Sequence, residues 1–363
     1  MTSLHIDTQR DWRGGQNQIL LLLRGLRGRG HKAELMALAD TVLEHRAREE
    51  EFRVHTIPAG FVRGGAALQM QKLLRGDEFD IVHAHDPHGL SAAWLARAHR
   101  RATLVAHRRI GNPLSPGRVA LARYRAARRI LAISDFVKQR MIASGIPPAQ
   151  IDVVYDGVEI PSGTTPDLRR AARQQWKIGE HEILLGCVGR LVPNKGQEIL
   201  LQALPAVLID FPDCRLILAG DGKCRPALEK LSRELGIAER VIFAGAVENI
   251  AQIYRAIDIF LFPAIGEGLG SSLLEAMSFG LPAVAAESGG VPEIIDDGCD
   301  GLLAPASSPK VLAETVLRVL KNPALAAQLG TAARKKIAPQ FTADRMVEST
   351  LAAYKKALEV LPQ

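Results

Sequence analysis

The chain has 363 residues, enough for two domains of ordinary size, and 47% of them are hydrophobic, as in a typical globular protein. No apolar run approaches the ~18 residues of a membrane-spanning helix, and the N-terminus shows no signal-peptide pattern. The 4 cysteines are scattered without a C-x-x-C pair, which argues against a zinc site and a disulfide framework. We therefore expect a cytoplasmic globular protein.

The net charge of +7 is concentrated in the first half of the chain. Residues 1–160 hold 24 Lys and Arg against 16 Asp and Glu, whereas residues 161–363 hold 22 against 23. A basic surface can face nucleic acid, an anionic lipid or an anionic substrate. Because aromatic residues make up only 5% of the chain and no zinc-finger, RRM or KH pattern occurs, we expect no nucleic-acid partner.

Strand and helix patterns alternate along the first half, which predicts a parallel sheet. The chain opens with a strand at 4–7, a loop at 11–15 that contains Gly14 and Gly15, and a helix from about Gln16. Further strands are expected at 33–37, 54–57, 80–84, 102–106, 130–133 and 151–155.

The stretch P-S-G-T-T-P at 161–166 is the clearest linker signal in the chain. Strand patterns resume after it at 183–188, 215–219, 241–244, 258–262 and 282–286, again with helices between them. We predict an α/β protein of two doubly wound, Rossmann-like domains, 1–160 and 161–342, facing each other across a cleft. Domains of this class bind ligands at the carboxyl ends of their strands.

Residues 263–277 read P-A-I-G-E-G-L-G-S-S-L-L-E-A-M and follow an apolar strand. The turn is rich in glycine, and a helix opens near Ser271, so the backbone of Gly268, Leu269, Gly270 and Ser271 can approach an anion closely. Glu267 and Glu275 bracket this turn, and carboxylates accept hydrogen bonds from sugar hydroxyls. An anion site flanked by carboxylates favours a nucleotide sugar as the ligand.

A second explanation exists for part of this pattern. Ser272 and Glu275 have the spacing of a capping box, which stabilises a helix N-terminus without any ligand. Glu267 and the glycines are not required by a cap, and they favour the ligand site.

The form E-G-x-G-x-x-x-x-E-A-M, from Glu267 to Met277, resembles the signature of the family 4 retaining glycosyltransferases of GT-B fold. The resemblance extends over nearly the whole chain and includes Gly14-Gly15, V-G-R-L at 188–191 with Lys195-Gly196, and S-G-G-V-P-E-I-I at 288–295. It implies GT-B architecture, with a final helix within 343–363 that crosses back to the first domain. We expect that helix to follow a break at Pro339.

The resemblance also implies roles for individual residues. Glu275 would hold the ribose hydroxyls of a donor nucleotide, and Glu267 the donor sugar. Arg190 and Lys195 follow a strand, where a guanidinium fork and an ammonium suit a diphosphate; a solvated surface pair is the alternative. The Gly14-Gly15 backbone would face the diphosphate or the sugar, unless these glycines serve only the turn.

Histidines cluster at two predicted strand ends. His107 follows the strand at 102–106 and occupies the place of the family histidine that reaches the donor sugar. His83 and His85 alternate along the neighbouring strand, so we expect them on one face, with His85 or Asp86 as further candidates for the site. A structural role is the alternative for each histidine.

We expect no metal and no cofactor besides the nucleotide-diphosphate sugar donor, because no Asp-x-Asp motif occurs in the chain. The G-D-G-K-C stretch at 220–224 lacks the third glycine of a dinucleotide fingerprint. The expected activity is a retaining hexosyl transfer to a hydroxyl of a larger acceptor, a cell-envelope glycolipid or a lipopolysaccharide or polysaccharide precursor. The alternatives are a non-catalytic sugar-nucleotide-binding protein and a Rossmann-type oxidoreductase.

Arginines crowd the later part of the first half. We expect one helix to carry Arg118, Arg123, Arg125, Arg128 and Arg129, with Arg97, Arg100, Arg101, Arg108 and Arg109 nearby in sequence. Two explanations remain open at this level. The arginines form a solvated face, or they attract an anionic acceptor or an anionic membrane, on whose inner face the protein would bind peripherally.

Overall fold

The computed structural model describes residues 1–58, 60, 62–114 and 117–359. The chain divides into two compact units, Met1–Gly157 with Ala343–Gln363, and Val158–Thr342. The first boundary lies three residues before the expected one at 160/161, and the second coincides with 342/343. Residues 360–363, part of the expected final segment, lie outside the described residues.

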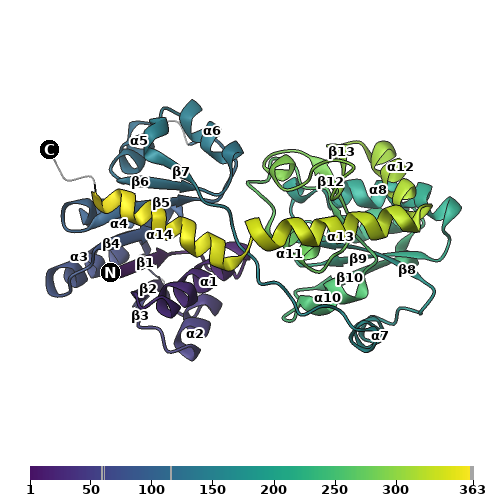
Figure 1. Cartoon of the computed structure of the whole chain (residues 1–363), viewed down its shortest axis with the longest axis horizontal. Coiled ribbons are helices and arrows are strands. Elements are labelled where there is room, and N and C mark those ends of the chain that lie inside the picture. Colours follow the sequence, from purple (N-terminus) through teal and green to yellow (C-terminus); the bar gives the residue numbers. More distant parts are fainter. Residues whose placement is uncertain (59, 61, 115–116, 360–363) are drawn as a thin grey trace. The chain divides into compact units, whose positions relative to one another are not determined.

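The first unit is built on a seven-stranded sheet with the order β3-β2-β1-β4-β5-β6-β7, and every neighbouring pair is parallel (Figure 1). Its elements are β1 (Thr2–Asp7), α1 (Gly14–Gly28), β2 (Lys32–Leu38), α2 (Val42–Glu49), β3 (Val54–Ile57), α3 (Val62–Gly76), β4 (Ile81–Ala84), α4 (Pro87–Leu95), η1 (Ala98–Arg100), β5 (Thr103–Arg108), α5 (Arg118–Arg125), β6 (Arg129–Ala132), α6 (Asp135–Ala143), η2 (Pro148–Gln150), β7 (Ile151–Val153) and α14 (Ala343–Glu359).

The second unit carries a six-stranded parallel sheet with the order β10-β9-β8-β11-β12-β13 (Figure 1). Its elements are α7 (Pro166–Gln175), β8 (Ile183–Val188), η3 (Pro193–Lys195), α8 (Gln197–Asp210), β9 (Cys214–Ala219), α9 (Arg225–Glu234), η4 (Ala238–Arg240), β10 (Val241–Gly245), α10 (Ala251–Ala256), β11 (Ile259–Phe262), α11 (Ser271–Ser278), β12 (Ala283–Glu287), η5 (Val291–Glu293), β13 (Leu302–Pro305), α12 (Pro309–Leu320) and α13 (Pro323–Gln340).

The C-terminal helix α14 belongs to the core of the first unit. Its residues Met346, Val347 and Tyr354 are buried in one cluster with the apolar stripe of α1. The two helices approach closely at Gly25, where an added Cβ would come within 2.3 Å of the Val347 side chain. A chain segment far away in sequence therefore completes the first sheet's hydrophobic cover.

All the strands expected in the first half are present, and several boundaries differ. Helix α1 begins at Gly14, so Gly14 and Gly15 form its first turn and do not belong to the loop. Pro339 lies inside the last turn of α13, and the break before α14 falls at Phe341–Thr342. The edge strand β13 escaped prediction, because its alternation is only four residues long.

The predicted arginine helix is shorter than expected. Helix α5 ends at Arg125, and Arg129 is the first residue of β6. The side chains of Arg123, Arg125 and Arg129 bind Ser91 Oγ, Gly145 O and the Asp152 carboxylate. These arginines are engaged within the protein and do not form one helical face. No helix among the described residues has the length and apolar character needed to cross a membrane.

Candidate active site

The strand order of the second unit reverses between β8 and β11. The chain runs outward from β8 through β9 to β10, and then returns to the other side of β8 to continue through β12 and β13. At such a switch point the two loops that follow the central strands diverge and leave a crevice for ligands. Those loops are 189–196 and 263–270, the glycine-rich stretches singled out in the sequence.

Two glycines let these loops approach each other at backbone distance. A Cβ at Gly196 would lie 2.2 Å from Pro263 O, and one at Gly289, in the loop after β12, would lie 2.1 Å from Glu267 O. Both residues also have a positive φ, of 70° and 65°. No other residue type fits at these positions, so the glycines fix the loop that carries Glu267.

Lys195 and Glu267, predicted separately as diphosphate and sugar ligands, form an ion pair across the switch point. Their side chains keep 24% and 21% of their surface exposed, so the pair remains open to a ligand. The aromatic face of Phe262 lies 5.9 Å from Lys195 Nζ and adds a cation–π contact. The arrangement places one positive and one negative group side by side at the end of β8 and β11.

The remaining predicted residues of this loop differ in exposure. Arg190 is exposed directly after β8, whereas Gly268, Leu269 and Gly270 are buried and Ser271 is half-buried. Gly270 is the N-cap of α11 and has a φ of 126°. The loop backbone therefore leads directly into the N-terminus of α11, where the helix dipole favours an anion.

The capping-box explanation for Ser272 and Glu275 is wrong. The N-cap of α11 is Gly270, which makes no side-chain cap, and the Ser272 hydroxyl donates to Val188 O at 2.9 Å instead. The Glu275 carboxylate accepts a hydrogen bond of 2.7 Å from the Tyr254 hydroxyl. Ser272 thus ties α11 to β8, and Glu275 is held by α10 rather than by its own helix terminus.

Burial raises the pKa of the Glu275 carboxyl above its usual range, and the hydrogen bond from Tyr254 opposes that shift. Burial, together with the neighbouring Glu275 carboxylate, raises the pKa of the Tyr254 hydroxyl well above its ordinary value, so the hydroxyl stays protonated and donates. Tyr254 was missed in the sequence, since it lies in a short helix 21 residues before Glu275.

The first unit has the same kind of switch point, between β1 and β4. Asp86, the residue singled out there, caps α4 by accepting from the N–H groups of His88 and Gly89. Its two oxygens also accept from the Thr8 N–H at 3.0 Å and the Thr8 hydroxyl at 2.9 Å. Asp86 therefore binds the loop after β1 to the start of α4.

Asp7 ends β1 and is the main polar residue that the sequence patterns did not reveal. It is 2% exposed and accepts from the Gln16 side chain at 3.2 Å. Desolvation, with the nearby Asp86 charge, raises its pKa to about 7. The available signal was its position at the carboxyl end of a central strand, where ligands bind in sheets of this class. Asp86 was identified from the corresponding position at the end of β4.

Three of the histidines form one buried cluster across β1 and β4. His5, which was not predicted, pairs with His83 in register, and the His83 and His85 rings lie 4.0 Å apart between centroids. The expectation that His83 and His85 share one face is confirmed. His5 Nδ1 and His85 Nε2 are 3.0 Å apart, and His83 Nδ1 lies 2.6 Å from the Tyr354 hydroxyl of α14.

His107 lies inside the end of β5, not after it, and extends this cluster. Its ring stacks on that of His83 at 5.5 Å, and its Nδ1 lies 3.3 Å from an Arg109 guanidinium nitrogen. Burial and the Arg109 charge lower its pKa well below the ordinary value, so its imidazole is neutral. Nε2 of His107 is buried without a hydrogen-bond partner among the described residues.

Arg109 joins His107 to two other segments of the first unit. Its guanidinium forms an ion pair with the buried Asp156. Its aliphatic stem passes Gly15, where an added Cβ would lie 3.5 Å from Arg109 Cδ, an ordinary van der Waals distance. The start of α1, the end of β5 and the segment after β7 thus meet at the Arg109 side chain.

Two groups among the described residues have the geometry to hold a metal ion. The buried His5, His83 and His85 each offer one ligand atom within 4.8 Å of the others, and Asp40, Glu44 and His45 form a second group at the surface. Both groups lie in the first unit, and neither includes Lys195, Glu267 or Glu275 of the second unit.

The chain matches two models of known protein families. Residues 12–160 match the model described as Glycosyltransferase Family 4, and residues 169–336 match Glycosyl transferases group 1. The division between the two matches, at residues 161–168, lies a few residues after the boundary between the two units.

Curated relatives agree with these matches. A D-inositol 3-phosphate glycosyltransferase of Mycobacterium avium is 31% identical over 302 residues, 77% of this chain and 70% of the relative. A GDP-mannose-dependent alpha-(1-6)-phosphatidylinositol monomannoside mannosyltransferase of Mycolicibacterium smegmatis is 30% identical over 257 residues, 68% of this chain and 63% of that relative. The chain thus spans somewhat less than two thirds of the mannosyltransferase.

Solved structures show the same fold. The crystal structure of Anabaena Alr3699/HepE in complex with UDP and glucose matches with a TM-score of 0.86 at 23% identity, over 98% of this chain and 99% of that one. A glycosyltransferase from Rickettsia africae matches with a TM-score of 0.87 at 20% identity, over 99% of each chain. Both units therefore have the Rossmann-like GT-B architecture, and the chain belongs to the group 1, family 4 glycosyltransferases.

Proposed function

We propose that the protein is a retaining, metal-independent hexosyltransferase. It transfers a sugar from a nucleotide-diphosphate donor to a hydroxyl of a carbohydrate or glycolipid acceptor, of the kind that serves as a cell-envelope glycolipid or polysaccharide precursor. The observation that carries the proposal is the Lys195–Glu267 ion pair at the switch point of the second sheet. A cation suited to the departing diphosphate stands beside a carboxylate suited to the sugar.

The donor would lie along the loops that follow β8 and β11. Arg190 and Lys195 neutralise the charge that develops on the leaving diphosphate, and the N-terminus of α11 supports the same charge. Glu275 accepts hydrogen bonds from the ribose hydroxyls. When the diphosphate occupies Lys195, Glu267 is released from its ion pair to receive hydroxyls of the donor sugar.

In this proposal His107 contacts the donor sugar through its Nε2. The support is that this nitrogen is buried and has no hydrogen-bond partner among the described residues, so its hydrogen-bonding capacity is unused. The Gly14-Gly15 turn at the start of α1 offers backbone N–H groups to the donor. Retention follows if the acceptor hydroxyl attacks on the face from which the diphosphate departs, with a phosphate oxygen taking the proton. The bond from the anomeric carbon to the phosphate oxygen breaks, and the bond to the acceptor oxygen forms.

The experiment that tests the proposal pairs a donor screen with product analysis. Purified protein is incubated with UDP-, GDP- and ADP-sugars, and release of the nucleoside diphosphate is measured with and without acceptor sugars and phosphoinositides. UDP-glucose and GDP-mannose come first, because the related proteins are named for these ligands or crystallised with them. NMR of the product then reports whether the anomeric configuration is retained.

A non-catalytic sugar-nucleotide-binding protein is the competing function. It predicts saturable binding of one nucleotide sugar without turnover for any acceptor. Turnover that is lost in Lys195→Ala and Glu267→Gln favours the enzyme. An inverted product would contradict the retaining mechanism and leave the transferase intact.

Peripheral contact of the first unit with an anionic membrane is a further part of the proposal, supported by the excess of Lys and Arg in residues 1–160. Such contact would bring the enzyme to a lipid-borne acceptor on the inner face of a membrane.

A further inference from the structure

The arginines of the first unit fall into two classes. Those at 108, 109, 123, 125 and 129 bind carbonyls, hydroxyls or carboxylates of the protein itself. The side chains of Arg75, Arg97 and Arg100, by contrast, make no hydrogen bond or ion pair with any described residue, and each residue is exposed. These three residues lie close together.

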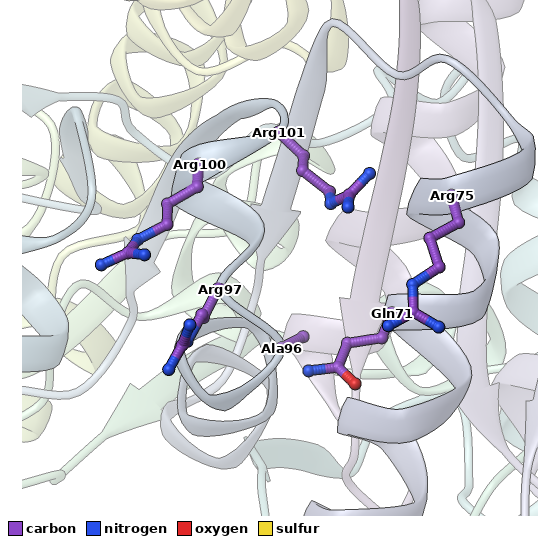
Figure 2. Close-up of a pocket in the computed structure, with 6 residues that line it drawn as sticks. All are labelled: Gln71, Arg75, Ala96, Arg97, Arg100 and Arg101. Carbon is purple, nitrogen blue, oxygen red and sulfur yellow. The ribbon is translucent and has the colours of Figure 1, made fainter.

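These arginines line a single open cavity of 550 Å³ (Figure 2). Its walls are formed by Gln71, Arg75, Ala96, Arg97, Arg100 and Arg101, which come from the end of α3, the end of α4 and the η1 turn. Arg101 also reaches Leu74 O at 3.4 Å, which anchors one wall to α3. The lining contains several guanidinium groups and no carboxylate, so its positive charge is uncompensated.

The cavity lies apart from the candidate active site of the same sheet. Arg101 precedes the first residue of β5 by two positions, so the cavity belongs to the amino-terminal edge of the parallel strands. Asp7, Asp86 and His107 stand at the opposite, carboxyl-terminal edge. A ligand in the cavity would therefore not compete with one at the strand ends.

Arg97 is held there in an unfavourable backbone conformation. It follows the C-cap of α4 with φ 55° and ψ 35°, the left-handed region in which glycine is the usual residue. A side chain with a Cβ is strained in that region, and backbone strain of this kind clusters at functional sites. The chain therefore places a cation at the rim of the cavity at a position where glycine would fold more easily.

We propose that this cavity binds a phosphate-bearing anion. A guanidinium presents parallel N–H groups that match phosphate oxygens, and several of them around one cavity suit a diphosphate or a phosphomonoester better than a carboxylate. The amide of Gln71 adds a neutral donor to the same wall. Binding would relieve the mutual repulsion of the arginines, and it does not depend on the identity of the donor proposed above.

The phosphate can belong to a soluble molecule or to the headgroup of a lipid. Two exposed leucines stand beside the cavity: Leu95 immediately precedes the lining residue Ala96, and Leu68 precedes Gln71 by one turn on the same face of α3. Leu68 keeps 66% and Leu95 51% of its surface exposed. Apolar side chains next to a phosphate site are expected of a headgroup site, so the test needs both arms.

The soluble arm measures melting temperature against added pyrophosphate, with chloride adjusted to constant ionic strength. Arg97→Gly removes one lining guanidinium and relieves its left-handed strain, so the apo melting temperature should stay equal or rise. The matched control is Lys177→Gly, which removes a cation at an exposed residue of the second unit with nearly the same φ, 52°. Lys195→Ala serves as a background in which binding at the proposed donor site is weakened.

All of these variants are made in the Lys195→Ala protein. Pyrophosphate should raise the melting temperature of Lys195→Ala with Lys177→Gly as much as that of Lys195→Ala alone. The rise should shrink by more than half in Arg97→Gly and disappear in Arg97→Gly with Arg100→Gln. Equal pyrophosphate responses in all of these proteins would overturn a soluble phosphate as the ligand.

The lipid arm is flotation with vesicles of phosphatidylcholine alone or with added phosphatidylglycerol. A headgroup site predicts binding to the anionic vesicles that is lost in the Arg97→Gly, Arg100→Gln double variant and kept in Lys177→Gly. A positive result in either arm with this pattern of variants supports the proposal and identifies the source of the phosphate. If both arms give the same result for the double variant and for Lys177→Gly, the cavity is not an anion site.

Discussion

The two sheets share one strand order around their switch points, and the chemistry at those points differs. In the second unit the crevice is shaped by backbone, with glycines at 196 and 289 and a half-exposed Lys195–Glu267 pair. In the first unit it is filled by buried titratable side chains, Asp7, Asp86 and the histidines. Glycine loops leave room for a phosphate, whereas buried neutral imidazoles present fixed hydrogen-bonding atoms. Fold alone therefore does not determine which half binds the donor.

The largest effect expected from this contrast is kinetic. Lys195→Ala should lower kcat/KM by roughly 10²-fold or more if, as proposed, its charge faces the leaving diphosphate, and Arg190→Ala should act in the same direction. Lys230→Ala is the matched control, since Lys230 forms an exposed ion pair with Glu234 in α9. Steady-state kinetics with the identified donor measure both, and unchanged kcat/KM in Lys195→Ala and Arg190→Ala would remove the diphosphate assignment.

Glycine-to-alanine substitutions should lower the stability of the second unit but not that of the first. Gly289→Ala places a Cβ against the Glu267 backbone at positive φ and should destabilise the second unit by roughly 2–4 kcal/mol. Gly15→Ala, in the first turn of α1, meets only ordinary contacts and should leave the melting temperature unchanged or higher. If Gly15→Ala nevertheless loses activity while remaining folded, its backbone faces the donor as proposed.

These glycines also show what could be predicted from sequence. The positions of the strands along the chain and the loop at 263–270 followed from hydrophobic patterns and from local turn residues, which act over a few positions. The close approaches of Gly196 to Pro263 and of Gly289 to Glu267 join segments far apart in the chain, and no local pattern encodes them. The ion pair of Lys195 with Glu267 was missed for the same reason.

The first unit's polar core was only partly predictable. Alternation along β4 placed His83 and His85 on one face, but His5 joined them through the lateral pairing of β1 with β4, and Asp7 follows two positions later at the end of β1. The extent of the arginine helix was wrong because Arg129 is the first residue of β6, where its charge is satisfied by Asp152. A basic residue in a strand cannot be distinguished from one on a helix by charge alone.

Asp7 should give the first unit a pH-dependent stability. Its folded pKa of about 7 lies above the 3.8 of an unfolded aspartate, so its contribution favours folding at low pH and is lost as the pH rises toward 7. Asp7→Asn cannot ionise, and its stability relative to the wild type should increase by about 1.4 kcal/mol for each pH unit across that window.

Melting temperatures measured on both proteins between mildly acidic and mildly basic pH give this difference. Asp213→Asn is the control, because Asp213 is exposed and without a partner among the described residues. A difference between Asp7→Asn and wild type that stays flat with pH would mean that Asp7 ionises normally in the folded protein.

Glu275→Gln should have a smaller effect, restricted to nucleotide binding. The amide oxygen can still accept the Tyr254 hydrogen bond, so the melting temperature should hardly change, while loss of the charged acceptor should weaken nucleoside diphosphate binding about tenfold. Glu267→Gln should spare the free nucleotide and weaken only the nucleotide sugar. Calorimetry with both ligands separates the two carboxylates, and equal losses for both ligands in both variants would contradict the proposed division.

The raised pKa of Glu275 adds a pH signature to the same residue. Protonation removes the carboxylate charge, so the affinity of the wild type for the nucleotide should fall as the pH is lowered. This fall should begin at a higher pH than the ordinary pKa of a glutamate carboxyl would give. Glu275→Gln should lack that acid limb.

The smallest expected effect is that of chelation. If Arg190, Lys195 and the N-terminus of α11 carry the diphosphate charge as proposed, activity should survive excess EDTA unchanged. The first unit makes this a sharp test, because His5, His83 and His85 are the buried group able to hold an ion. If EDTA abolishes activity and Mg²⁺ restores it, the donor site uses a metal despite lacking an Asp-x-Asp. If Zn²⁺ alone restores it, and His83→Asn protein gains nothing from Zn²⁺, the metal belongs to the histidine cluster. Either outcome would mean that a metal ion contributes to the reaction, and that Lys195 is not sufficient to stabilise the charge of the leaving diphosphate.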